Sequence, residues 1–148
     1  MKEYVDWNYI SSNQKLSEKF IREFKDRVDW YWVSGYQTLS EEFIREMKDY
    51  VDWSGVSLCQ RLSENFIREF KDRVDWKNIS KYPRYPKILS EDFIREFKDK
   101  VDWGYISSNH RLDESFIREF KDYVDWGCIK KFQTLSDGFK EEFKDKLG

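Results

Sequence analysis

The chain has 148 residues, the length of one ordinary domain, and is rich in both aromatic (19%) and charged (38%) residues. A disordered chain would share the charge but not the aromatic content, so the composition indicates a folded protein. The net charge of −2 excludes a general electrostatic attraction to nucleic acid or to an anionic membrane.

Six copies of a repeat of about 23 residues follow one another along the chain. They begin at Leu16, Leu39, Leu62, Leu89, Leu112 and Leu135, with successive spacings of 23, 23, 27, 23 and 23 residues. Residues 1–15 form a partial repeat ahead of the first leucine, and residues 135–148 form a last repeat without a second helix. We interpret residues 1–148 as a single helical-repeat domain.

Each repeat predicts two helices. In the first repeat, one apolar stripe at helical period is formed by Phe20, Ile21, Phe24 and Val28. Ser17 stands before this first helix as its N-cap. Asp29 is the expected N-cap of a shorter second helix, which begins at Trp30.

A helix pair of this length cannot bury its apolar face alone, so neighbouring pairs must stack. The sequence therefore predicts an all-α fold, an α-solenoid of six helix-pair repeats. We expect the tryptophan of each VDW tripeptide to lie in the core. Pairs such as Glu18 and Arg22, with the acid four residues ahead of the base, should support the first helices. Lys140 replaces the stripe isoleucine of the last repeat and should cap the stack against solvent.

No residue pattern predicts catalysis. The only histidine, His110, stands where other repeats carry glutamine, and no second histidine or close cysteine pair exists to build a zinc site. Carboxylates such as Glu23 and Asp26 recur in nearly every repeat, whereas an active site is made once. We expect no enzyme activity, no cofactor and no metal.

Positions that differ between repeats predict the functional surface. Residues two and six after each VDW tryptophan lie on one face of the second helix, and they vary along with the residue that follows the tryptophan. The varying residues are rich in tyrosine and tryptophan, which dominate protein interfaces. A four-residue insertion with two prolines adds further candidates. The predicted partner-binding residues are Tyr9, Tyr31, Trp32, Tyr36, Tyr50, Tyr82, Arg84, Tyr85 and Tyr105.

The motif FIREFKD-x-VDW-x-x-IS resembles short helical repeats of uncharacterised proteins from bacteriophages and large DNA viruses, over nearly the whole chain. The resemblance implies a viral origin and brings no catalytic residue with it. By analogy with compact phage proteins that block a host factor, it implies an inhibitor of a host defence protein, similar to the anti-CRISPR proteins.

These observations predict a monomer that binds a protein partner. The alternative is a nucleotide or RNA binder that uses the same aromatic surface. No apolar segment approaches the roughly 18 residues that a membrane span needs, and two unmatched cysteines are no disulfide framework. We therefore expect a cytoplasmic protein, in the cytoplasm of the host cell if the origin is viral.

Overall fold

The computed structural model describes residues 4–81 and 89–148. Those residues form thirteen helices and no strand, which confirms the predicted all-α repeat fold. The contacts within the chain fall into two compact units, Met1–Asp75 and Trp76–Gly148. We call these unit 1 and unit 2 and describe each by itself.

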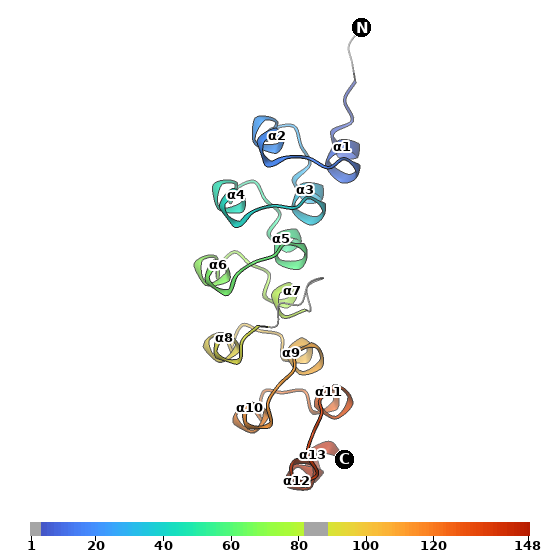
Figure 1. The fold of residues 1–148 in the computed structure, drawn as a ribbon, viewed down its shortest axis with the longest axis vertical. Coiled ribbons are helices and arrows are strands. Elements are labelled where there is room, and N and C mark those ends of the chain that lie inside the picture. Colours follow the sequence, from blue (N-terminus) through green and yellow to red (C-terminus); the bar gives the residue numbers. More distant parts are fainter. Residues whose placement is uncertain (1–3, 82–88) are drawn as a thin grey trace. The chain divides into compact units, whose positions relative to one another are not determined.

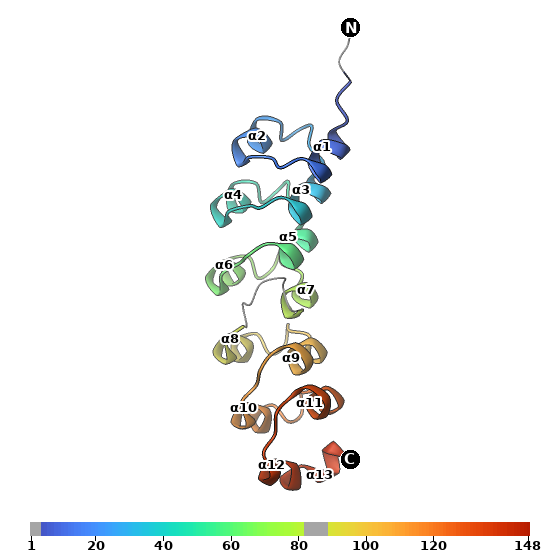
Figure 2. The same ribbon diagram turned by 45° about the vertical axis from the view of Figure 1, so that its right-hand side comes forward.

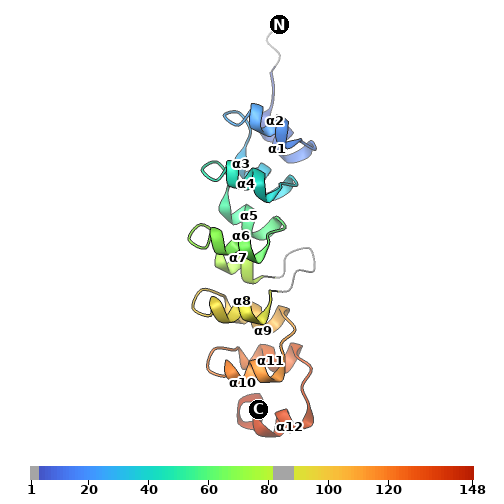
Figure 3. The ribbon, with the colours of Figure 1, turned by 60° about the vertical axis from the view of Figure 1, so that its left-hand side comes forward.

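Unit 1 contains three second helices and three first helices, which alternate along the chain. The second helices α1, α3 and α5 follow one another along one side of the unit, and the first helices α2, α4 and α6 along the other (Figure 1). Figure 2 and Figure 3 show the same two rows from other directions, the latter with the α2, α4 and α6 row brought forward. The bounds are α1 Trp7–Asn13, α2 Glu18–Glu23, α3 Trp30–Tyr36, α4 Glu41–Glu46, α5 Trp53–Cys59 and α6 Glu64–Glu69.

Unit 2 repeats this arrangement. Its second helices α7, α9 and α11 form one row, and its first helices α8, α10 and α12 form the other, followed by a short helix α13 (Figure 1). The bounds are α7 Trp76–Ser80, α8 Glu91–Glu96, α9 Trp103–Asn109, α10 Glu114–Glu119, α11 Trp126–Phe132, α12 Asp137–Glu142 and α13 Lys144–Leu147.

The helices begin at the predicted caps. The hydroxyl of Ser17 accepts a hydrogen bond from the backbone N–H of Phe20, and the Asp29 carboxylate accepts one from Tyr31. The first helix ends earlier than its apolar stripe suggested, at Glu23. A tight turn follows, in which the backbone N–H of Val28 still donates to the carbonyl of Phe24 at 3.0 Å.

The core follows the predicted stripe, with one correction. In α4 and the turn after it, Phe43, Ile44 and Val51 are buried. The VDW tryptophans are only half-buried, because each indole lies across a phenylalanine at the edge of the stack. Trp53 also donates a hydrogen bond from Nε1 to the carbonyl oxygen of Lys48 at 3.0 Å.

Buried polar side chains join neighbouring repeats. In unit 1 the amide of Gln60 binds three backbone groups where its repeat meets the preceding one. Oε1 accepts from the N–H of Leu39, the first residue of its own repeat, at 3.0 Å, and Nε2 donates to the carbonyls of Ser34 and Gln37 in the preceding repeat at 2.8 and 2.7 Å. The buried hydroxyl of Ser34 accepts a hydrogen bond from the backbone N–H of Asp52 at 2.9 Å. Backbone groups that the short helices leave open thus find partners in the next repeat.

The arginines of the first helices also bind between repeats, in addition to the predicted pairing within a helix. Arg22 donates from Nε and Nη2 to the two carboxylate oxygens of Glu46, at 2.7 and 2.8 Å. This hydrogen bond lowers the pKa of Glu46. In unit 2 two of the predicted pairs also form, Glu91 with Arg95 at 3.8 Å and Glu114 with Arg118 at 3.9 Å. The planar guanidinium of Arg22 and the planar carboxylate of Glu46 form two parallel hydrogen bonds. This bidentate geometry favours the pair between repeats over a pair within one helix.

The acids expected to pair with these arginines have another role. Glu18 accepts a hydrogen bond from the backbone N–H of Ser40, the N-cap of the next first helix, and Glu41 accepts one from Ser63 in the same way. The arginine and the glutamate four residues before it therefore both bind the following repeat.

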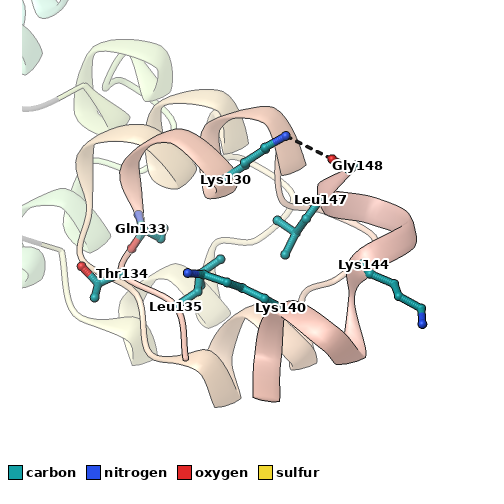
Figure 4. A pocket seen from close by; sticks show the side chains of 8 residues that line it. All are labelled: Lys130, Gln133, Thr134, Leu135, Lys140, Lys144, Leu147 and Gly148. Atoms are coloured by element: carbon teal, nitrogen blue, oxygen red, sulfur yellow. Dashed lines mark hydrogen bonds between the residues drawn. The ribbon is translucent and has the colours of Figure 1, made fainter. Parts of the chain in front are cut away.

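The last first helix departs from this pattern. Lys140, predicted to face solvent, is exposed, whereas its equivalents Ile21 and Ile44 are fully buried. Lys140 lines an open hollow of about 550 Å³ together with Leu135 and Leu147 (Figure 4). Lys130 lines the same hollow, and its Nζ donates to the backbone oxygen of Gly148 at 3.3 Å. The residues at this end of unit 2 are those that elsewhere face a following repeat.

Candidate partner-binding surface

The second helices of unit 1 carry no charged side chain. Their sequences are WNYISSN, WYWVSGY and WSGVSLC for α1, α3 and α5. The first helices, by contrast, are dominated by charge, as in EKFIRE of α2. Because α3 contacts both α1 and α5, the three helices share one surface whose polar groups are hydroxyls and amides. This uncharged surface is the candidate site.

Three aromatic rings form a cluster on α3. The ring of Trp32 lies 5.2 Å from that of Tyr31 in an edge-to-face arrangement and 5.0 Å from that of Tyr36. The two tyrosines are 61% and 62% exposed, so they present most of their area to solvent. Rings that pack on one another are held in place before any partner binds, which lowers the entropy cost of binding.

Trp32 was expected to be exposed, but the structure shows it half-buried. The reason is visible at Gly55, which occupies the same position in α5. A Cβ atom on Gly55 would lie 3.2 Å from both the Cβ of Ser34 and the backbone nitrogen of Gly35. This position therefore faces the preceding second helix, and a large side chain there lies partly between two helices. Variation at Gly55 serves helix packing rather than binding.

Two other predicted residues of unit 1 lie apart from the three-ring cluster. Tyr9 is 56% exposed on α1 and extends the same uncharged surface. Tyr50 lies in the turn after α4, where its ring centroid is 5.6 Å from that of Trp30 and the Nζ of Lys25 lies 5.3 Å above it. Tyr50 therefore belongs to the charged turn and not to the second-helix surface.

The remaining predicted residues do not join this surface. Tyr105 lies on α9 in unit 2, where it is half-buried with the Nζ of Lys81 at 5.3 Å from its ring. Tyr82, Arg84 and Tyr85 lie outside the described residues. Of the nine predicted residues, the structure places Tyr9, Tyr31, Trp32 and Tyr36 on the second helices of unit 1.

Sequence reasoning missed Leu58. It is 39% exposed on α5, on the same helix row as the three-ring cluster. The equivalent positions hold Ser12 in α1 and Gly35 in α3, so variation between repeats could have identified it. Leu58 adds an apolar contact to the uncharged surface.

His110 fits a structural role in unit 2. Its Nε2 lies 3.1 Å from the carbonyl oxygen of Ser80, and burial lowers its pKa. Within residues 4–81 and 89–148, no group of three or more histidine, cysteine, aspartate or glutamate side chains could hold a metal ion. Cys59 and Cys128 are free thiols. None of the described helices is long and apolar enough to cross a membrane.

No protein-family model, curated protein or solved structure matches the chain.

Proposed function

We propose that the chain is a non-enzymatic helical-repeat scaffold that binds a protein partner through the uncharged surface of α1, α3 and α5. The observation that carries this proposal is the cluster of Tyr31, Trp32 and Tyr36, whose two tyrosines are exposed on a helix without a charged residue. Elsewhere in the described chain, ion pairs cover the first helices. A neutral aromatic surface on a charged protein is not needed for folding, and interfaces are enriched in these residues.

The composition of this surface favours a protein partner. Tyrosine, tryptophan, serine, asparagine and glycine are the residues of antibody binding loops, because they combine rigid contact area with adaptable hydrogen bonding. A nucleic-acid site combines aromatic rings with a basic groove, and α1, α3 and α5 offer only the rings. The alternative of nucleotide or RNA binding on the same surface is therefore the weaker proposal.

The resemblance to viral helical repeats suggests the kind of partner. We propose a host defence protein, which the scaffold would inhibit in the host cytoplasm by covering a surface. A scaffold without catalytic groups can act only by occupying such a surface, so its effect should be stoichiometric and reversible. This proposal rests on analogy between repeats.

The test compares binding by variants of the purified chain. Tagged wild-type chain is used to isolate a partner from host lysate, and the affinity is then measured by calorimetry. Trp32→Ala combined with Tyr36→Ala should weaken binding at least thirtyfold, since an interface hot spot contributes about 2 kcal/mol or more. Circular dichroism should show unchanged helix content.

Two control variants alter exposed residues away from the site. Lys48→Ala removes a charge in the turn after α4, and Tyr123→Ala removes an exposed tyrosine in the turn after α10. Both should bind like the wild type. Equal loss in the tyrosine control would mean that aromatic exposure in general, and not the α3 cluster, governs binding.

A further inference from the structure

The three-ring cluster on α3 carries hydrogen-bond donors that the fold leaves unused. The indole of Trp32 forms no hydrogen bond with a described residue, and its Nε1 is reachable from solvent. The indoles of Trp30 and Trp53 differ, because each donates from Nε1 to the carbonyl of a lysine five residues earlier, at 2.9 and 3.0 Å. The hydroxyls of Tyr31 and Tyr36 likewise form no hydrogen bond within the described part of the chain. One indole and two phenols therefore offer donors to a partner.

Strong acceptors are scarce on the same surface. The helices α1, α3 and α5 contain no carboxylate. The carboxylate just ahead of α3, that of Asp29, already accepts hydrogen bonds from the backbone N–H groups of Tyr31 and Trp32, at 3.0 and 3.5 Å. A phenol hydroxyl both donates and accepts, whereas an indole N–H only donates. The cluster therefore complements a segment that exposes carbonyl oxygens and few N–H groups.

Secondary structure limits which protein segments have this property. Inside an α-helix the backbone N–H and C=O groups bind each other, so neither is free. An edge strand presents donors as well as acceptors. In the polyproline II conformation the carbonyls have no internal partner, and each proline lacks an N–H. A proline-rich segment is therefore the one that offers an excess of free acceptors.

The arrangement of the rings favours the same ligand. The rings of Tyr31 and Tyr36 lie 5.2 and 5.0 Å from that of Trp32, and both tyrosines are exposed. Proline-rich segments dock on aromatic-lined surfaces, where pyrrolidine rings pack against the aromatic faces. Both sides are ordered before they meet, since the aromatic rings hold one another and polyproline II is already extended. This match needs no charge, in agreement with the uncharged surface around the cluster.

We propose that the cluster of Tyr31, Trp32 and Tyr36 binds a proline-rich segment of the protein partner in the polyproline II conformation. The Trp32 indole and a tyrosine hydroxyl donate to carbonyl oxygens of this segment while its prolines pack on the rings. This inference rests on the proposed function and assigns the chemistry of the partner at the same surface.

The experiment uses a decaproline peptide with acetylated and amidated ends as the probe. It is added to the isotope-labelled full chain, and the indole N–H resonances are followed by NMR. The Trp32 resonance, assigned by its disappearance in Trp32→Phe, should shift and saturate. The resonances of Trp30 and Trp53 should stay in place, because their N–H groups are bonded within the fold. A glycine-serine peptide of equal length, which has N–H groups and no proline ring, should cause no shift.

Variants measured by calorimetry separate the rings from the donor. Tyr36→Ala should weaken peptide binding about tenfold, as truncation of an interface anchor does. Trp32→Phe keeps a ring but removes the indole N–H, and the loss of one hydrogen bond should weaken binding about fivefold. The matched control is Tyr123→Ala, which truncates an exposed tyrosine of unit 2 and should bind the peptide normally. Equal weakening in this control, an unmoved Trp32 resonance, or an equal shift with the glycine-serine peptide would overturn the proposal.

Two further outcomes concern the occupant of the cluster. The chain has prolines of its own at Pro83 and Pro86, outside the described residues. Their joint replacement by alanine should leave the peptide affinity unchanged, and a gain would overturn the assignment to a separate partner. The peptide test is also distinct from the test of the proposed function. If the peptide does not bind while the partner isolated from lysate still depends on Trp32 and Tyr36, a folded surface occupies the cluster and the proline-rich segment is ruled out.

Discussion

The imidazole Nε2 of His110 lies 3.1 Å from the carbonyl oxygen of Ser80, so this nitrogen carries a proton and donates it. The side chain is 2% exposed, and its Nδ1 has no hydrogen-bond partner among the described residues. A second proton on Nδ1 would place a buried charge there without compensation. Burial accordingly lowers the pKa of His110.

Stability should therefore fall as the pH drops below the pKa of an unfolded histidine, about 6.5. The folded-state pKa is lower, so the unfolded chain takes up the proton first, and acid favours unfolding. His110→Gln, which restores the residue of other repeats, removes this effect because no other histidine exists. Urea unfolding between about pH 7.5 and pH 5 should show a smaller loss for the variant than for the wild type. Equal losses of stability in the variant and the wild type would show that a group other than His110 causes the pH dependence.

Gln60→Leu should destabilise the protein strongly. It leaves three backbone groups of Leu39, Ser34 and Gln37 without their partner, in a region where Gln60 is 7% exposed. Each unsatisfied buried group costs about 1–3 kcal/mol, so we expect a loss of about 3 kcal/mol or more in the free energy of unfolding. The measurement is urea unfolding followed by circular dichroism.

The control for this prediction is Gln14→Leu. Gln14 has the same place in the motif, but it is exposed and its side chain binds no backbone group in the described residues. Its replacement should change the free energy of unfolding by less than about 0.5 kcal/mol. A large effect at both positions would show that the glutamine acts within its own helix and not between repeats.

Gly35→Ala and Gly55→Ala should shift stability in opposite directions. A Cβ on Gly35 meets no atom within 4 Å, so alanine there gains helix propensity of up to about 1 kcal/mol. A Cβ on Gly55 would lie 3.2 Å from the backbone nitrogen of Gly35, and α3 and α5 would have to separate. Melting temperatures should rise for the first variant and fall for the second. A higher melting temperature for both variants would contradict this prediction, because it would show that α5 can shift away from α3 without loss of stability.

The sequence predicts the helices well because their signals are local. Ser17 and Asp29 cap the helices they were expected to cap, and the stripe of Ile21 and Val28 is buried. Periodicity reports which residues recur, but not which residues they contact. Arg22 has Glu18 four residues before it and Glu46 24 residues after it. It forms its bidentate hydrogen bonds with Glu46 because the stacking of repeats brings these two side chains together.

The candidate site shows the same division. Variation between repeats located Tyr31 and Tyr36, whose exposure depends only on the face of α3. It could not separate a position that contacts a partner from one that faces the neighbouring helix. Trp32 and Gly55 share one such position, and its partial burial follows from the distance between α3 and α5. The distance between α3 and α5 cannot be obtained from the spacing of residues in the sequence.

The last prediction concerns salt, and it separates the two proposed kinds of partner. Binding to nucleic acid releases counterions, so for a single strand the slope of log K against log salt is about −0.7 for each phosphate contacted. The helices α1, α3 and α5 offer no charged side chain to replace those counterions. The affinity for the purified protein partner should therefore change less than about threefold between roughly 50 and 200 mM salt. Calorimetry at several salt concentrations gives the slope, with Trp32→Ala as the variant that weakens binding at every concentration. A slope of about −3 or steeper would contradict an uncharged interface and show that charged side chains outside these helices contribute to binding.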